Sequence, residues 1–121
     1  MFTDVRAVAV GVADTDAAIA FFIDRLGFEL RMDFAMSETF RWVEVAPPGA
    51  QTSVALLSSD GPPVGIDTGI RFVVDDAAAT HAALSASGVR VDELIVSDYA
   101  PPMFDFSDPD GNVYYASEIG S

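Results

Sequence analysis

Three charged residues of this chain have the types and the setting to act on a small molecule: Glu44, Arg71 and Asp105. Each lies in a short run in which apolar residues alternate with others, the pattern of a β-strand that turns one side away from the core. A carboxylate there can serve as a general base when burial raises its pKa, and a guanidinium can hold a carboxylate or an oxyanion. These three residues are therefore the candidates for catalysis.

The same alternation places three larger side chains, Trp42, Met103 and Tyr115, on the same side of the strands. Small residues such as Ala9 and Ala55 share this side and leave room beside them. A mostly apolar wall with a few polar groups is typical of a small-molecule pocket. The predicted ligand-binding residues are Trp42, Glu44, Arg71, Met103, Asp105 and Tyr115.

A structural interpretation of these residues stays open beside the functional one. Arg71 and Asp105 could pair across neighbouring strands, and Glu44 could reach solvent at a rim, because ion pairs also occur in ordinary networks. Trp42 and Tyr115 could pack as plain wall.

The other side of the strands must pack on helices, and it is apolar throughout. Its residues are Val8, Val10, Val12, Val43, Val45, Val54, Leu56, Ile70, Phe72, Val74, Phe104 and Phe106. The strands therefore predict sheets with one packed side and one side that faces a cleft.

The chain contains an internal duplication, in which residues 7–28 align with residues 69–89 when Val12 is placed on Val74. Each copy is an apolar strand, an Asp at the strand–helix junction, a helix of about three turns, and a Gly followed by a large apolar residue.

The ends of both helices are marked by residue type. Asp14 and Asp76 can accept hydrogen bonds from the free N–H groups of the first turn. Gly27 and Gly88 supply the left-handed position after the last turn, and they align only after a slip of one residue.

Each predicted helix is followed by three strand-like runs, at 28–34, 40–45, 52–57, 93–96, 103–106 and 113–117. The PPG at 47–49 and the DPDG at 108–111 predict hairpin turns. Both halves therefore have the order βαβββ, an α+β fold. We expect a single domain, 1–121, of two modules, 1–57 and 68–121, joined by a Gly/Pro/Ser-rich linker at 58–67.

The chain resembles the vicinal oxygen chelate superfamily, which includes glyoxalase I, bleomycin-resistance proteins and extradiol dioxygenases. The resemblance covers nearly the whole chain and is most specific at IAFFIDRLGFEL (19–30) and MFDFSDPDGNVYYASE (103–118). It implies two βαβββ modules whose mixed sheets curl around a cleft, usually in a homodimer.

The resemblance also bears on metal binding, because metal-dependent relatives place a His, Gln or Glu ligand on the first and last strand of each module. Here those positions are Ala7, Ala55, Gly69 and Tyr115, a poor donor set for divalent ions. We therefore expect no metal and no cofactor, with a site rebuilt from Glu44 and Asp105 as the alternative.

The remaining motifs have simple interpretations. His81, the single His, falls in the second helix rather than on a strand that faces the cleft. The alternating Asp108, Asp110 and Asn112 suggest a calcium loop, but an EF-hand needs Gly at its sixth position and an acid at its twelfth, so a hairpin turn is preferred. No Cys, nucleophile elbow or phosphate-binding Gly loop occurs.

Composition excludes several classes of protein. Of 121 residues, 19 are Asp or Glu against 6 Arg and no Lys, a formal net charge of −13, which argues against nucleic acid or an anionic membrane as partner. Half of the residues are hydrophobic, enough for a core. No export or membrane-spanning segment is indicated, and we expect a cytoplasmic protein.

Three functions fit this sequence. The first is a bleomycin-resistance-like protein that binds a small cationic or aromatic compound in a metal-free cleft. The second is an enzyme of the superfamily, a lyase, isomerase or dioxygenase-like member acting on a small carbonyl or aromatic substrate. The third is a dimeric module with a vestigial cleft. Fold alone does not choose among them, so whether the protein is an enzyme stays open.

Overall fold

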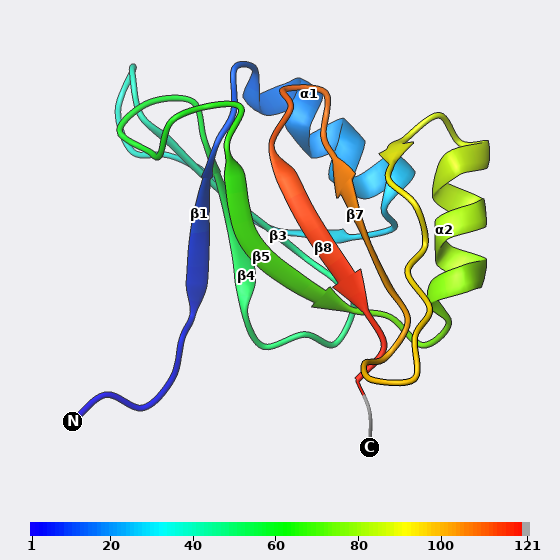
Figure 1. The fold of residues 1–121 in the computed structure, drawn as a ribbon. Coiled ribbons are helices and arrows are strands. Elements are labelled where there is room, and N and C mark those ends of the chain that lie inside the picture. Colours follow the sequence, from blue (N-terminus) through cyan, green and yellow to red (C-terminus); the bar gives the residue numbers. More distant parts are fainter. Residues whose placement is uncertain (120–121) are drawn as a thin grey trace. The chain divides into compact units, whose positions relative to one another are not determined.

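The structure, a computed structural model, describes residues 1–119 and divides into two compact units (Figure 1). The first comprises Met1–Gly65, and the second begins at Ile66. Each holds one copy of the duplicated sequence and one four-stranded mixed sheet, so that the predicted α+β fold is confirmed in the described residues.

The first unit has its strands in the order β1-β4-β3-β2. The sheet joins β1 and β4 in parallel and the other neighbours antiparallel. The bounds of the strands are β1 Ala7–Gly11, β2 Glu29–Ala35, β3 Arg41–Ala46 and β4 Ser53–Leu57. Between β1 and β2 lies helix α1 (Thr15–Ala20), which continues as a π-helical turn, η1 (Phe21–Arg25).

The second unit repeats this topology in the order β5-β8-β7-β6. Its elements are β5 Asp67–Val73, α2 Ala77–Ala86, β6 Arg90–Val91, β7 Met103–Ser107 and β8 Val113–Ser117. The strand expected at 93–96 lies earlier, at Arg90–Val91, and only an isolated bridge between Ile95 and Met103 remains. The reason is that the segment after β6 pairs with β7 only at separated points, such as Asp92 N to Asp105 O.

The predicted helix ends are confirmed. The Asp14 carboxylate accepts a hydrogen bond from Ala17 N at 3.1 Å, and the Asp76 carboxylate accepts one from Ala79 N at 3.0 Å. Gly27 has φ of 74°, the left-handed backbone that glycine adopts without a steric penalty. The residue types at these positions therefore set where both helices begin and where the first helix ends.

The hairpin at 108–111 is tied to a single buried carboxylate. Asp108 Oδ1 accepts from the backbone N–H groups of Asp110 and Asn112, and Oδ2 accepts from Asn112 Nδ2 and the Tyr114 hydroxyl, all at 2.8–3.0 Å. Both oxygens are thus used by the protein's own donors. The hairpin-turn interpretation is confirmed over the calcium loop.

Burial along the strands of the second unit follows the predicted alternation. Phe104, Phe106, Tyr114 and Ala116 are buried, whereas the residues between them are half-buried. In the first unit, β3 and β4 are buried on both sides of the sheet along most of their length. The sheet of the second unit thus has an open side, whereas the central strands β3 and β4 of the first unit are enclosed on both sides.

His81 lies in α2 as predicted. Its Nε2 is 2.7 Å from Asp92 O, and its ring meets the Phe104 ring edge-on at 5.1 Å. Within residues 1–119, no helix is long and apolar enough to cross a membrane.

Candidate functional site

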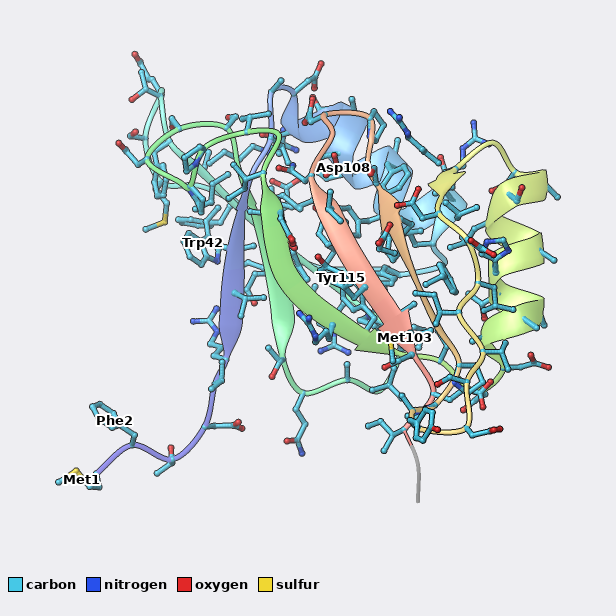
Figure 2. All side chains as sticks on the ribbon, viewed as in Figure 1. Met1, Phe2, Trp42, Met103, Asp108 and Tyr115 are labelled. Carbon is cyan, nitrogen blue, oxygen red and sulfur yellow. The ribbon has the colours of Figure 1, made fainter. Side chains whose placement is uncertain are left out.

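The open side of the second sheet gathers the charged residues that the sequence singled out. In the strand register, Tyr115 on β8 lies between Arg71 on β5 and Asp105 on β7. Tyr115 and Met103 are labelled on this sheet in Figure 2. Three neighbouring strands therefore present a cation, an aromatic ring and an acid at one level of the sheet.

Arg71 is held over the aromatic ring rather than paired with an acid. Its guanidinium carbon lies 4.4 Å from the centre of the Tyr115 ring, and Nη1 donates to Gly69 O at 2.8 Å. Within residues 1–119 no ion pair joins Arg71 to Asp105 or to any other carboxylate. The alternative that Arg71 and Asp105 form an ion pair is thus not observed in these residues.

Tyr115 is fixed from its other end by Asp67. The hydroxyl donates to Asp67 Oδ2 at 2.6 Å, and Gly69 N donates to Oδ1 at 3.0 Å. The hydrogen bond with Asp67 raises the pKa of Tyr115, and both hydrogen bonds together with the charge of Arg71 lower the pKa of Asp67. Tyr115 is therefore neutral, and its hydrogen bond to Asp67 fixes the orientation of its ring.

Sequence reasoning missed Asp67, because it was counted as the last residue of the linker. The structure makes it the first residue of β5, and the register shifts between Asp67 and Arg71 where Gly69 has φ of 69°. A glycine inside a strand can signal such a bulge. That was the one available sign that residues before Gly69 turn toward the site.

Asp105 has the raised pKa that a base near neutral pH requires. A side-chain hydrogen bond with Asp92, partial burial and the charges of Asp92 and Asp67 raise the pKa of Asp105 to about 6. The carboxyl thus changes its charge close to neutral pH. Asp92, like Asp67, was not among the predicted site residues.

These groups border a hollow of about 190 Å³. Its walls are mainly apolar, and they include four of the six predicted ligand-binding residues. The lining residues are Arg71, Ile95, Met103, Phe104, Asp105, Tyr115, Ala116 and Ser117. The apolar walls suit a ligand body, and the charged residues at the border suit its polar groups.

The other two predicted residues, Trp42 and Glu44, lie in the first unit and bind each other. Glu44 Oε2 accepts from Trp42 Nε1 at 2.6 Å and from Arg6 Nη2 at 2.7 Å. The Glu44 side chain is 5% exposed, so the alternative that it reaches solvent at a rim is wrong. Arg6 was missed because it precedes the predicted strand.

A metal does not fit the positions that metal-dependent relatives use. The side chains of Ala7, Ala55 and Gly69 carry no donor atom, and the Tyr115 hydroxyl is engaged as a donor to Asp67. In the described part of the chain, no three His, Cys, Asp or Glu side chains are grouped to hold an ion. Glu44 and Asp105 lie in different units.

Comparison with known proteins identifies the family. A sequence model of the Glyoxalase/Bleomycin resistance protein/Dioxygenase superfamily matches residues 5–114. The chain belongs to this superfamily, as the duplicated βαβββ fold indicates. Its members bind small molecules and often form dimers.

Individual relatives agree with this assignment. A crystal structure of a superfamily member from Sphaerobacter thermophilus DSM 20745 is 33% identical, with 98% of each chain covered and a TM-score of 0.89. TnmS3, an antibiotic binding protein from Streptomyces sp. CB03234, is also 33% identical over 98% of each chain, with a TM-score of 0.86. The uncharacterized protein YetH of Bacillus subtilis (strain 168) is 29% identical over 98% of this chain and all of its own length.

Proposed function

We propose that this protein binds a small organic molecule on the open side of the second sheet, without a metal. The observation that carries the proposal is Arg71, held over the Tyr115 ring beside an apolar hollow and without a carboxylate partner in residues 1–119. A guanidinium in this position can form two parallel hydrogen bonds to an anionic group.

The surroundings of Arg71 define the kind of ligand. An apolar or aromatic body would contact Met103 and Ile95, an anionic group would meet Arg71, and a hydroxyl or amine could donate to Asp105. The hollow of about 190 Å³ is smaller than a typical ligand pocket, so it would hold one part of a ligand. The antibiotic-binding relative TnmS3 supports a binding role.

The test of this proposal uses benzoate as an aromatic anion and benzyl alcohol as its neutral counterpart, each titrated into labelled protein and followed by NMR. We expect saturable shifts at Arg71, Met103 and Tyr115 with benzoate only. Arg71→Ala should weaken binding by about 1.5–3 kcal/mol, and Arg71→Lys should also weaken it.

Arg90→Ala is the matched control, since Arg90 is an exposed arginine in the same unit and lies outside the hollow. Benzoate binding should be the same in this variant as in the unchanged protein. Equal affinity in Arg71→Ala and the unchanged protein would refute the role of Arg71.

A second function is favoured by the raised pKa of Asp105. A carboxyl with a pKa of about 6 could remove a proton next to a carbonyl group, while Arg71 stabilises the oxyanion that forms. We expect such an enzyme to catalyse exchange of the carbon-bound protons of hydroxyacetone in D₂O, and Asp105→Asn to abolish the exchange. Exchange no faster than in buffer would exclude this function.

We also propose that the chain forms a homodimer. The edge strand β2 is exposed along its length, and it and the residue after it carry apolar side chains at every second position: Leu30, Met32, Phe34 and Met36. A long apolar edge strand is normally covered by a partner. Light scattering should give twice 12.8 kDa, and a particle of 12.8 kDa at micromolar concentration would refute the dimer.

A further inference from the structure

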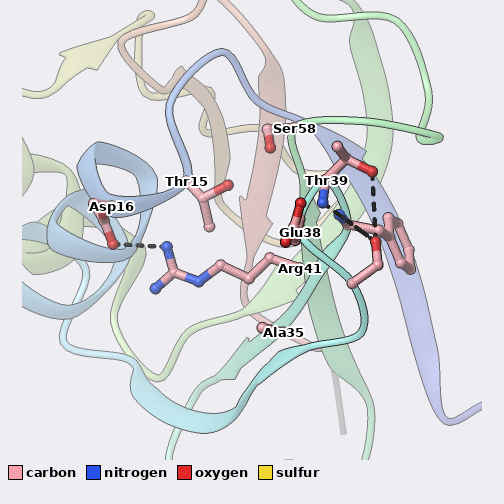
Figure 3. Close-up of a pocket in the computed structure, with 9 residues that line it drawn as sticks. Thr15, Asp16, Ala35, Glu38, Thr39, Arg41 and Ser58 are labelled. Carbon is pink, nitrogen blue, oxygen red and sulfur yellow. Dashed lines mark hydrogen bonds and ion pairs between the residues drawn. The ribbon is translucent and has the colours of Figure 1, made fainter.

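The first unit contains a cavity that is separate from the proposed ligand site of the second unit. It has a volume of about 340 Å³ and lies where the β2–β3 hairpin meets the start of α1 (Figure 3). The polar side chains around it are those of Thr15, Asp16, Glu38, Thr39, Arg41 and Ser58. This volume lies within the range of ordinary ligand pockets.

The wall of the cavity is held in place by its own hydrogen bonds. Arg41 binds both oxygens of Asp33 at 2.8 and 2.7 Å and donates its Nη1 to Asp16 at 2.9 Å. At the hairpin tip, Ser37 Oγ accepts from Phe40 N at 3.1 Å. The loop at 58–59 is joined to the tip, because the Ser59 hydroxyl donates to Thr39 O at 3.0 Å. The cavity is thus preorganised rather than a chance gap between loops.

Thr15 points to a ligand. Its side chain belongs to a residue that is only 7% exposed, yet its hydroxyl has no hydrogen-bond partner within residues 1–119. No fully enclosed side-chain oxygen or nitrogen in these residues lacks a partner, so the Thr15 hydroxyl is open to the cavity. Figure 3 shows it on the side that faces Ser58 and Glu38. A hydroxyl that is accessible from the cavity and unused by the protein is available to a bound molecule.

The other free groups of the cavity are mostly acceptors and carry a negative charge. The Glu38 carboxylate and the Ser58 hydroxyl have no partner in the described residues, and one oxygen of Asp16 is free of Arg41. Asp16 and Asp33 share the Arg41 guanidinium, and the Glu38 carboxylate lines the same cavity without an ion pair in the described residues. A complementary ligand would be positively charged and would offer several hydrogen-bond donors.

We propose that this cavity is a second binding site, which takes a polyhydroxylated amine of the amino-sugar class. Its ammonium group would lie at Glu38, and its hydroxyls would meet Thr15 and Ser58. The site is independent of Arg71 and of the hollow in the second unit, so either site can fail without the other.

The experiment titrates D-glucosamine, and separately D-glucose, into labelled protein and follows backbone shifts by NMR. We expect saturable shifts at Thr15, Glu38 and Ser58 with glucosamine, and at least tenfold weaker binding of glucose, which lacks the ammonium group. Glu38→Gln should weaken glucosamine binding about tenfold, and Thr15→Val about fivefold.

Two matched variants control for general effects of charge and of the hydroxyl. Glu93→Gln removes an exposed carboxylate in the second unit, and Thr3→Val removes an exposed hydroxyl near the N-terminus; both should bind glucosamine as the unchanged protein does. Absence of saturable shifts, equal affinity for glucose, or unchanged binding in Glu38→Gln would overturn the proposal. Glu38 is exposed, so that variant decides the question even if Thr15→Val fails to fold.

Discussion

The two units have the same topology but use the same three positions of the sheet differently. In the second unit, three neighbouring strands present Arg71, Tyr115 and Asp105 at one level. At the same level the first unit has Ala9, Ala55 and Glu44. Both units thus have an acid at this level, Glu44 on β3 and Asp105 on β7. They differ in the residues on the two neighbouring strands.

The surroundings of the two acids explain their different chemistry. Glu44 is enclosed and receives hydrogen bonds from Arg6 and Trp42, which compensate its negative charge. Asp105 has no cation bound to it within residues 1–119, and it faces Asp92 and Asp67. A compensated acid stabilises a fold, whereas an acid crowded by other acids is available to a ligand or a proton.

The largest difference should appear at the hairpin turns. Asp108→Ala removes the acceptor of four hydrogen bonds and leaves the buried Tyr114 hydroxyl and Asn112 amide without it, a loss of about 3–4 kcal/mol. Pro47→Ala in the first unit changes a turn closed by a backbone bond, Ala50 N to Pro47 O, and should cost under about 1 kcal/mol. Urea denaturation measures both, and similar losses would contradict the expectation.

The next largest effect should distinguish Arg6 in the first unit from Arg71 in the second. Among residues 1–119, Arg6→Ala leaves the enclosed Glu44 carboxylate with Trp42 as its one remaining donor, and it should lower the free energy of unfolding by about 2 kcal/mol. Arg71→Ala removes a cation–π contact on an open surface, worth at most about 1 kcal/mol. A larger loss for Arg71→Ala than for Arg6→Ala, in urea denaturation at pH 7, would show that Arg71 is structural.

Stability should depend on pH through Asp105. Because the pKa of Asp105 is raised to about 6 from 3.8, the folded protein binds its proton more tightly than the unfolded chain does between these values. Stability therefore falls as pH rises from about 4 to 6. Asp105→Asn should be stabilising by about 1 kcal/mol at pH 8, after allowance for solvent screening, and neutral at pH 3.

Glu44→Gln provides the comparison in the first unit. It replaces a carboxylate that accepts two close hydrogen bonds, so it should be destabilising at pH 8. Urea denaturation of both variants at pH 3 and pH 8 checks the signs. Destabilisation by Asp105→Asn at pH 8 would mean that the charged form of Asp105 has a favourable partner.

The smallest effect should come from removal of metal. At the positions of metal-dependent relatives the first unit has no donor side chain and the second has only the Tyr115 hydroxyl, which is bound to Asp67, so dialysis against a chelator should leave Tm unchanged within about 1 °C. Elemental analysis of gently purified protein is the second measurement. A stoichiometric transition metal would show that another set of residues binds it.

Much of the fold could be predicted from short-range patterns. Alternating apolar residues located most of the strands, and Asp14 and Gly27 marked the ends of the first helix, because these signals act within a few residues. The predicted position of β6, at 93–96, was wrong because a strand of two residues has no periodicity to detect. Its pairing with β7 depends on contacts distant in sequence.

The site could be predicted only in part. Alternation was enough to place Arg71, Asp105 and Tyr115 on the same side of the strands, because side chains two residues apart share a side of a strand. Glu44 could not be distinguished from Asp105, since both are acids in alternating runs and only tertiary burial separates them. Asp67 reaches the site through a bulge, a backbone feature that alternation does not describe.

The π-helical turn η1 accounts for the one-residue slip between the copies. One residue more separates Asp14 from Gly27 than separates Asp76 from Gly88, and in η1 the Leu26 N–H bonds to Phe21 O, five residues back. A π-turn accommodates one inserted residue without rotating the rest of the helix. The first copy is therefore one residue longer between these two positions, and the π-turn takes up that residue while the apolar Phe22 stays buried.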